Sequence, residues 1–372
     1  MGYKSKAVRI SSTLEQEIRA GQFDPEKYLP GEDALAERYQ VSRSTIRRVI
    51  EILDHEGVVV KEPNRGTMIA ANSLRHPLPK EPRTITMAWA YAAYPDSMIS
   101  NVTAGIQRFA EEREINLQIF TSSTGHEPVL ESIEKAAAFG VDGVILLPYN
   151  LDCYVASVKK VIAAEIPVVT IADLAGSGAS SVASDDFGGA FQSIQYLIAR
   201  FDRPCYFLGS TCETSSCTER YEAFRTAMRE AGFESEIDSY TISLDPDGQK
   251  PEYWPLVQKE LHPRELCLTI FDRIKLPASV FCINDYIARG LYQAAQERGV
   301  VIGRDLMVSG FGDLPFASRL VPQLTTVKTD SAQMGYQTAK VLYQHIIKEV
   351  TSPVRLRLPV EFTVRASIAG KQ

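Results

Sequence analysis

The sequence predicts an α/β protein in which a small winged helix-turn-helix domain precedes a larger, two-lobed body with doubly wound parallel sheets. Three observations predict this architecture. Residues 1–72 hold three short helix patterns followed by two β-branched runs around a turn. Residues 73–84 form a polar stretch with three prolines, which is typical of a linker. Residues 85–372 alternate short apolar strand patterns with amphipathic helix patterns.

The composition is that of an ordinary soluble protein, with 45% hydrophobic and 23% charged residues and no apolar run long enough for a membrane span. The first ten residues, MGYKSKAVRI, lack the apolar segment of a secretory signal, so we expect a cytoplasmic protein. Six dispersed cysteines do not suggest a disulfide framework in that compartment. Cys212 and Cys217 have no companion histidine cluster, so we expect neither a metal site nor a cofactor.

The charge is unevenly distributed along the chain. Its net value is −6, which by itself argues against a nucleic-acid partner. Residues 1–75, however, carry 12 basic and 11 acidic side chains, whereas the remainder carries 28 and 35. Between Arg38 and Arg48 there are four basic side chains and no acidic one. This local excess permits DNA binding by the N-terminal domain.

The third helix pattern of this domain has one apolar face and one basic face. Ile46, Val49, Ile50 and Leu53 recur at the spacing of a buried helical stripe, and arginines and hydroxyls occupy the other side. Such a face is either a solvated surface or a surface that docks on phosphates and base edges. Before it, two further helices are predicted, one with Ile10, Leu14 and Ile18 on its inner face and one over residues 32–39. After Gly57, the runs 58–60 and 67–70 predict a hairpin.

The stretch LPGEDALAERYQVSRSTIRRVIEILDHEGVVVKEPNRGTMI resembles the DNA-binding head of the GntR family along its whole length. The resemblance implies that Arg43 contacts bases, with Ser44, Thr45 and Arg47 beside it, and that the wing tip reaches the minor groove or the backbone. Ser42 could instead be only a helix cap and Arg48 only a solvated side chain. Asp33 departs from the family, which often has a DNA-contacting residue there. The full set of expected DNA contacts is Ser42, Arg43, Ser44, Thr45, Arg47, Arg48, Asn64, Arg65 and Gly66.

The body resembles the LacI/GalR regulators and related sugar-binding proteins from about residue 85 to residue 367. The resemblance is carried by GVDGVILLP, VASDDFGGAF, SSCTERYEAFRTAMREAGF, ASVFCINDYIARGLYQAAQERG and the LMVSGFGD segment with its continuation PQLTTVKTD. It implies a periplasmic-binding-protein-like domain whose two lobes enclose a small molecule, and which forms a homodimer. A GntR-type head on such a body resembles the architecture of arabinose-responsive repressors.

The resemblance places the ligand contacts at the carboxyl ends of strands. Arg220 is the strongest candidate, because its planar guanidinium suits two oxygens at once. Met98 falls where the family has an aromatic pair, and Gly312 replaces a carboxylate that usually binds a sugar hydroxyl, so Asp313 could substitute for it. Asp186 and Asp285 could be helix caps. The expected ligand contacts are Tyr94, Asp96, Met98, Tyr149, Asp173, Arg220, Asn284, Asp313 and Thr329.

These features predict a transcription regulator, a repressor, controlled by a small-molecule effector that the resemblance suggests is a sugar. A regulator that responds to a non-sugar metabolite is the alternative. An enzyme is disfavoured, because the chain has no G-x-S-x-G, P-loop or H-E-x-x-H motif and its five histidines are dispersed. A transport-type binding protein is disfavoured by the DNA-binding head. The sign of the effector's action on DNA binding is not specified by these patterns.

Overall fold

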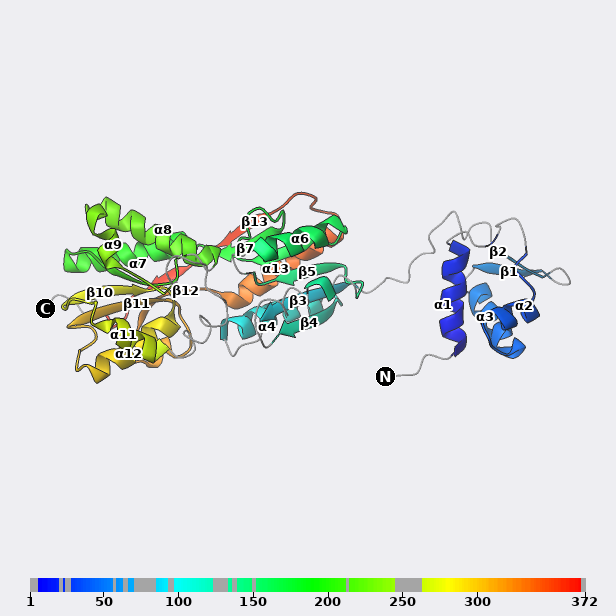
Figure 1. Ribbon diagram of the computed structural model, residues 1–372, viewed down its shortest axis with the longest axis horizontal. Coiled ribbons are helices and arrows are strands. Elements are labelled where there is room, and N and C mark those ends of the chain that lie inside the picture. Colours follow the sequence, from blue (N-terminus) through cyan, green and yellow to red (C-terminus); the bar gives the residue numbers. More distant parts are fainter. Residues whose placement is uncertain are drawn as a thin grey trace. The chain divides into compact units, whose positions relative to one another are not determined.

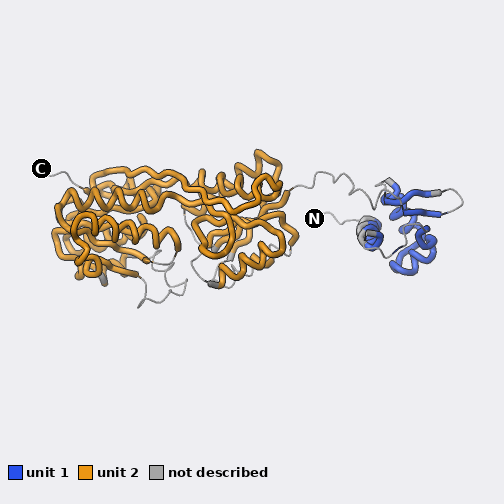
Figure 2. Tube along the Cα trace, turned by 90° about the horizontal axis from the view of Figure 1, so that it is seen from above, with its two compact units in different colours: residues 1–83 blue, residues 84–372 orange. Residues whose placement is uncertain are grey.

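The structure is a computed structural model that describes residues 6–19, 23, 28–55, 58–62, 66–69, 85–92, 97–122, 133–135, 139–148, 152–211, 214–244 and 263–368. The chain divides into two compact units, residues 1–83 and 84–372 (Figure 2). The predicted linker, residues 73–84, lies outside the described residues.

The first unit, here called the head, consists of three helices and a two-stranded wing (Figure 1). The helices are α1 (Lys6–Arg19), α2 (Glu32–Arg38) and α3 (Arg43–His55), and the antiparallel wing strands are β1 (Val59–Glu62) and β2 (Gly66–Ile69). The predicted winged helix-turn-helix is therefore confirmed. Its core is built from the apolar faces that the periodicity indicated, including Leu14, Ile18, Leu35, Ile46, Val49, Ile50 and Leu53, all at most 2% exposed.

The second unit, here called the body, has two six-stranded sheets, one in each lobe (Figure 1). The N-lobe sheet has the order β13-β7-β6-β5-β3-β4 and is entirely parallel. Its strands are β3 (Thr86–Ala92), β4 (Asn116–Ser122), β5 (Gly143–Leu146), β6 (Val168–Ile171), β7 (Ser180–Ser184) and β13 (Arg355–Leu358). The helices of this lobe are α4 (Ser97–Glu112), α6 (Asp152–Ala163) and α13 (Ser331–Ile346).

The C-lobe sheet has the order β14-β12-β11-β10-β8-β9, with only β14 antiparallel to its neighbour. Its strands are β8 (Tyr206–Gly209), β9 (Thr241–Ser243), β10 (Ala278–Cys282), β11 (Leu306–Gly312), β12 (Thr325–Lys328) and β14 (Glu361–Thr363). The helices are α7 (Asp186–Phe201), α8 (Ser215–Glu230), α9 (Ile237–Tyr240), α11 (Pro263–Phe271) and α12 (Asp285–Glu297), with short 3₁₀ turns at Glu234–Glu236 and Ala317–Arg319.

Central strands of both sheets are buried on both faces, which explains why the sequence shows continuous apolar runs there rather than alternation. Strands β5, β6, β7, β8 and β10 are buried at every position. The predicted doubly wound α/β fold with two lobes is thus confirmed. Residues 127–139, where the alternating pattern of the body also predicts a helix, fall largely outside the described residues.

The chain crosses between the lobes three times. It passes from β7 to α7, from β12 to α13 and from β13 to β14. The third crossing connects β13 in the N-lobe sheet to β14 in the C-lobe sheet. The sequence patterns did not predict these two short strands. These crossings bring the carboxyl ends of strands from both sheets to the boundary between the lobes, where ligands collect in folds of this kind.

Among the described helices, none has both the length and the apolar character that crossing a lipid bilayer requires.

Candidate functional site: a basic helix and an inter-lobe cleft

The basic face of the head lies on the first two turns of α3, beginning with its first residue, Arg43. Ser42 precedes this helix, and its Oγ accepts a hydrogen bond from the backbone N–H of Thr45 at 3.3 Å, as a capping serine does. The same hydroxyl lies 2.9 Å from the Oγ of Ser44 and 2.8 Å from the Oγ1 of Thr45. These three polar groups therefore cluster at the positive end of the helix dipole, where phosphate oxygens are favoured.

Glu32, the first residue of α2, holds two of the α3 arginines. Its Oε2 lies 3.0 Å from Nε of Arg43 and 3.2 Å from Nη2 of Arg47. Hydrogen bonds from Arg47 and Arg43 lower the pKa of this carboxyl below its ordinary value, so it is ionised at neutral pH. Asp33 adds a longer ion pair, 3.4 Å from Nη1 of Arg43. The departure from the family pattern at Asp33 therefore places a second acid beside the same arginine.

The remaining head residues that were predicted to contact DNA divide into described and undescribed positions. Arg48 is exposed on α3, and Gly66 opens strand β2 with a φ of +123°, a conformation that favours glycine. Asn64 and Arg65 lie outside the described residues.

The body contains a cleft lined by residues of both lobes. The N-lobe wall is mainly apolar, and the C-lobe wall carries most of the hydroxyl, amide and guanidinium groups. The lining residues are Met98, Leu147, Pro148, Ile171, Ala172, Ala183, Ser184, Thr214, Ser216, Cys217, Arg220, Asn284, Tyr286, Phe311, Gly312, Leu314, Thr329, Ser331 and Met334. Four of the predicted ligand contacts, Met98, Arg220, Asn284 and Thr329, are among them.

Arg220 is the charged group among the described lining residues, and Asp186 binds it from behind. Its Nε and Nη2 lie 2.8 and 2.5 Å from Oδ1 of Asp186, and its Nη1 donates to the carbonyl of Ile283 at 2.7 Å. Asp186 is fully buried, and its other oxygen, Oδ2, accepts from the hydroxyl of Ser184 at 3.1 Å. The ring of Phe311 packs 3.7 Å from the guanidinium carbon. Because each terminal nitrogen of an arginine carries two N–H groups, one on each is left for a ligand.

The helix-capping roles at the start of α7 and α12 differ from the sequence interpretation. Asp185, not Asp186, caps α7, accepting from the N–H of Gly188. At α12 the cap is Asn284, whose Oδ1 accepts from the N–H of Ile287 at 3.0 Å, while Asp285 is fully buried. Asn284 thus caps its helix and also lines the cleft.

Asp285 holds together the loop that follows β11. Its Oδ1 accepts from the hydroxyl of Thr326 at 2.6 Å and its Oδ2 from the N–H of Leu314 at 2.7 Å. Burial raises its pKa to about 6 even though these hydrogen bonds favour the ionised form. Gly312 lies above it in a left-handed conformation with φ +127°, so this position is built for glycine and not merely a lost carboxylate.

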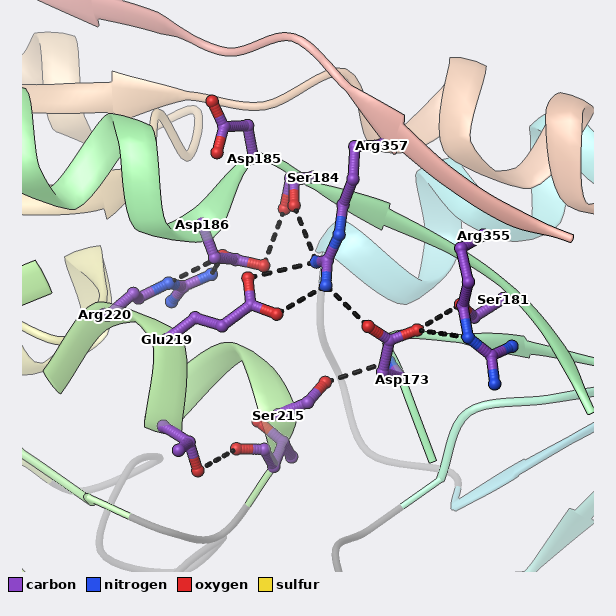
Figure 3. Close-up of polar contacts among 12 residues, drawn as sticks. Asp173, Ser181, Ser184, Asp185, Asp186, Ser215, Glu219, Arg220, Arg355 and Arg357 are labelled. Atoms are coloured by element: carbon purple, nitrogen blue, oxygen red, sulfur yellow. Dashed lines mark hydrogen bonds and ion pairs between the residues drawn. The ribbon is translucent and has the colours of Figure 1, made fainter. Parts of the chain in front are cut away.

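Two predicted contacts, Asp313 and Asp173, are not among the lining residues, because each carboxylate is bound to arginine elsewhere. Asp313 pairs with Arg365, whose Nη1 lies 2.7 Å from its Oδ1. Asp173 pairs with Arg357 and Arg355 at the junction of the lobes (Figure 3). Tyr94, Asp96 and Tyr149 lie outside the described residues.

Several lining residues had escaped the sequence analysis, chiefly Leu147, Ser184, Tyr286, Phe311 and Met334. Three of them lie at or just after the carboxyl end of a strand, where a systematic search of strand ends would have found them. Met334 belongs to α13, and only the tertiary packing of that helix reveals its role.

No group of three or more His, Cys, Asp or Glu side chains suited to a metal ion occurs among the residues that the structure describes.

Comparison with known proteins places these features in families. Residues 6–69 match the model of bacterial regulatory proteins of the gntR family, and residues 194–368 match that of the periplasmic binding protein-like domain. The chain is 25% identical to an arabinose metabolism transcriptional repressor of Geobacillus stearothermophilus over 92% of its length and 93% of the relative's. It is also 25% identical to a ribose operon repressor of Haemophilus influenzae, over 84% and 90% of the two chains.

Solved structures share the fold of the body. A LacI family regulator from Enterococcus faecium with bound ribose gives a TM-score of 0.63 at 20% identity, covering 77% of this chain and all of that one. The lac repressor dimer bound to operator and the anti-inducer ONPF gives 0.63 at 18% identity, covering 83% and 99%.

The chain therefore joins a GntR helix-turn-helix N-terminus to a periplasmic-binding-protein-like effector domain of the LacI type, with distant homology to arabinose metabolism repressors. It is a transcriptional regulator with an effector domain of the sugar-binding type. The relatives named here are repressors of transcription and not enzymes.

Proposed function

We propose that this protein is a cytoplasmic repressor that binds a two-fold operator as a homodimer and is controlled by a sugar held in the inter-lobe cleft. The single observation that carries the proposal is the placement of Arg220. It combines a buried counter-ion, an aromatic face and two N–H groups beyond those already donated, in a cleft lined by both lobes. A ligand there touches both lobes and can therefore change their relative position.

The DNA-binding half of the proposal is supported by α3. Its apolar stripe is buried in the head, while Arg43, Ser44, Arg47 and Arg48 are exposed along the opposite face. Arginine can bind guanine O6 and N7 together, and hydroxyls near a helix N-terminus suit phosphates. Asn64, Arg65 and Gly66 at the wing complete the proposed contact set, with Ser42 and Thr45 at the start of α3.

The homodimer is proposed from the relatives and from symmetry. A solved relative is a dimer on its operator. Two identical heads bind two half-sites related by the same two-fold axis, so that the operator is expected to be pseudo-palindromic. Linkage requires that, if the effector weakens operator binding by some factor, the operator weakens effector binding by the same factor.

The effector is proposed to bind with its oxygens toward Arg220, Asn284 and Thr329 on the polar side. A carbon face of the ligand would rest on the apolar N-lobe wall, where Met98 lies. The remaining predicted contacts Tyr94, Asp96, Tyr149, Asp173 and Asp313 stay predictions. Solved relatives of the same fold hold ribose and cellobiose.

A non-sugar metabolite is a second candidate, and the cleft lining favours it in one respect. Among the described lining residues no carboxylate occurs, and the position at which the LacI resemblance expects one is Gly312. A sugar hydroxyl that would donate to that carboxylate needs another acceptor. A ligand richer in carbonyl or carboxylate oxygens would not need such an acceptor.

A thermal-shift screen decides between the candidates. The purified chain is heated with pentoses, hexoses, uronic acids, disaccharides, sugar phosphates and a matched set of hydroxyl-poor carboxylic acids. A ligand at about 100 times its dissociation constant adds roughly 2.7 kcal/mol to native-state stability and raises the melting temperature. A sugar hit that also changes operator affinity supports the proposal, whereas turnover of the hit would contradict it.

A further inference from the structure

We propose that Arg357 is a positioning residue that ties the two lobes together beside the effector cleft, and thereby sets effector affinity. The inference rests on the proposed function only in taking the cleft at Arg220 as the effector site. The group formed by Arg357, Asp173 and Glu219 is called the inter-lobe latch below (Figure 3).

Arg357 belongs to the N-lobe but bonds to both lobes. It lies on β13, whose neighbour in the N-lobe sheet is β7. Its Nη2 is 2.5 Å from Oδ2 of Asp173, which follows N-lobe strand β6, and 2.5 Å from Oε1 of Glu219 on C-lobe helix α8. Its Nη1 is 3.0 Å from Oε2 of Glu219. The pair with Glu219 is therefore bidentate, the geometry in which an arginine–carboxylate pair is strongest.

A second inter-lobe hydrogen bond reinforces the latch from the same two segments. The backbone N–H of Asp173 donates to the hydroxyl of Ser215, the first residue of α8, at 2.9 Å. The first turn of α8 is thus bound at Ser215 and again, four residues on, at Glu219. This geometry fixes the helix both in position and in rotation about its axis.

The latch acts on the effector site through α8, because Glu219 is adjacent to Arg220 on that helix. The two arginine sites also meet at Ser184, whose carbonyl accepts from Nη1 of Arg357 at 3.3 Å and whose hydroxyl donates to Asp186, the counter-ion of Arg220. Figure 3 shows Arg357 and Arg220 on either side of this shared serine. Displacing Arg357 therefore loosens the tie between the N-lobe and the helix that carries the guanidinium of Arg220.

The environment of the latch makes its charges interdependent. Asp173, Glu219 and Arg357 are 25%, 26% and 39% exposed, so each is partly removed from water. Burial raises the pKa of Glu219 above its ordinary value, and Arg357 opposes that rise. Without the arginine, two partly buried carboxylates would face each other across the lobe boundary and favour its opening.

Arg355 provides a matched control two residues away on the same strand. Its Nε lies 3.6 Å from Oδ1 of Asp173 and its Nη1 donates to the carbonyl of Ala179, both N-lobe groups. It is 44% exposed, similar to Arg357. Replacing Arg355 by Gln therefore removes an arginine from the same cluster and leaves the lobe-to-lobe bonds of Arg357 and Ser215 in place.

The test compares Arg357→Gln, Arg355→Gln and the conservative Arg357→Lys in the full-length chain. Hydrogen–deuterium exchange is followed in the segment after β6 and in the first turn of α8. We expect Arg357→Gln to speed exchange there at least fivefold, Arg355→Gln to leave α8 unchanged, and Arg357→Lys to restore part of the protection. Equal acceleration in both Gln variants, or none in either, would overturn the latch, and neither outcome depends on knowing the effector.

Effector affinity supplies the second measurement, using the best hit of the thermal-shift screen as probe. Arg357→Gln should weaken its binding about tenfold relative to Arg355→Gln, with thermal unfolding showing that both variants are folded. Unchanged effector affinity with faster exchange would overturn the claim that the latch sets affinity. If no compound binds the wild type, the proposed sugar effector fails, while the exchange data still decide on the latch.

Discussion

Glu32 and Arg43 form an ion pair between α2 and the exposed face of α3, with Oε2 of the acid 3.0 Å from Nε of the arginine. The arginine with the strongest sequence claim to a base contact is therefore neutralised and oriented before DNA is present. Because the same carboxylate also bonds to Arg47, one acid restrains two cations of the proposed interface.

Replacing Glu32 by Gln should raise affinity for non-specific DNA and steepen its salt dependence. The variant adds one net positive charge to the interface and frees two arginines for phosphates, so the slope of log affinity against log salt should increase by about 1. Fluorescence anisotropy with a random duplex at several salt concentrations measures it. An unchanged slope would show that the arginines reach phosphate without leaving Glu32.

Arg43→Ala should weaken cognate operator binding by about 1–3 kcal/mol and have a much smaller effect on random DNA, as expected for a bidentate base contact. Arg48→Ala is the comparison on the same helix. It should weaken binding to the operator and to random DNA by the same small factor, because a phosphate contact carries no sequence information. An operator selected from a random library serves for both measurements. Equal losses on both duplexes for Arg43→Ala would remove it from the base-reading set.

Arg220→Ala should abolish the response to effector. From its buried contact with Asp186 we also expect this variant to have a lower free energy of unfolding. Removing the arginine leaves the fully buried Asp186 without its partner, which costs about 3–5 kcal/mol for a buried ion pair. The double variant Arg220→Met with Asp186→Asn removes both charges and should recover most of that loss. Urea unfolding and operator binding with and without effector separate the two effects. Induction that survives in the folded double variant would show that the effector binds elsewhere.

Asp285 should make stability depend on pH in a defined window. Its pKa is raised to about 6 by burial, so between its ordinary value of 3.8 and about 6 the folded chain binds a proton that the unfolded chain lacks. Its contribution therefore stabilises the fold fully below pH 3.8 and is lost as the pH rises through about 6. The free energy of unfolding, measured with urea from pH 4.5 to 7.5, should therefore fall with rising pH more steeply in wild type than in Asp285→Asn. Parallel curves of this free energy against pH would contradict the assignment.

Gly105→Ala and Gly335→Ala should each destabilise the body by about 1–3 kcal/mol, the usual range for overpacking. Helices α4 and α13 touch through their backbones: an added methyl at Gly105 would lie 1.9 Å from the carbonyl oxygen of Ala332, and one at Gly335 would lie 2.0 Å from that of Val102. Gly31→Ala, with no atom within 4 Å of the added methyl, is the matched substitution. The melting temperatures of the three variants, measured against wild type by thermal unfolding, give the comparison.

The sequence predicted those parts of the fold that depend on local periodicity. The stripe of Ile46, Val49 and Ile50 on α3 and the continuous apolar runs of the central strands were sufficient, because burial of one helical face or of both faces of a strand leaves a repeating pattern. Residues 234–243, which form a 3₁₀ turn, α9 and β9, and the strands β13 and β14 escaped prediction. Their residues are stabilised by neighbours far along the chain, and β13 has an alternating exposed and half-buried pattern too short to distinguish from a loop.

Residues of the candidate site could be predicted from the sequence only where a family motif contains them. Arg220 was found through its family motif, but its counter-ion Asp186 had been considered as a possible helix cap. Asp173 was expected near the ligand because it follows a strand, and Asp313 because it could substitute for the carboxylate missing at Gly312. Both carboxylates are instead bound to arginines that come from residues 355–365. No local pattern predicts pairings between residues that are 52 positions apart, as in Asp313 and Arg365, or 184 apart, as in Asp173 and Arg357.

The late strands β13 and β14 have a consequence for synthesis of the protein. Each completes a different sheet, so neither lobe has its full set of strands until residues 355–363 have left the ribosome. The head, in contrast, is complete by residue 69. A chain that is interrupted or clipped before the final strands would therefore keep an intact DNA-binding surface while lacking the edge strands of both lobes and Arg357. Under the proposed function, such a fragment would keep the contacts of the head but lose the response to effector, so loss of these few residues would uncouple the two halves of the protein.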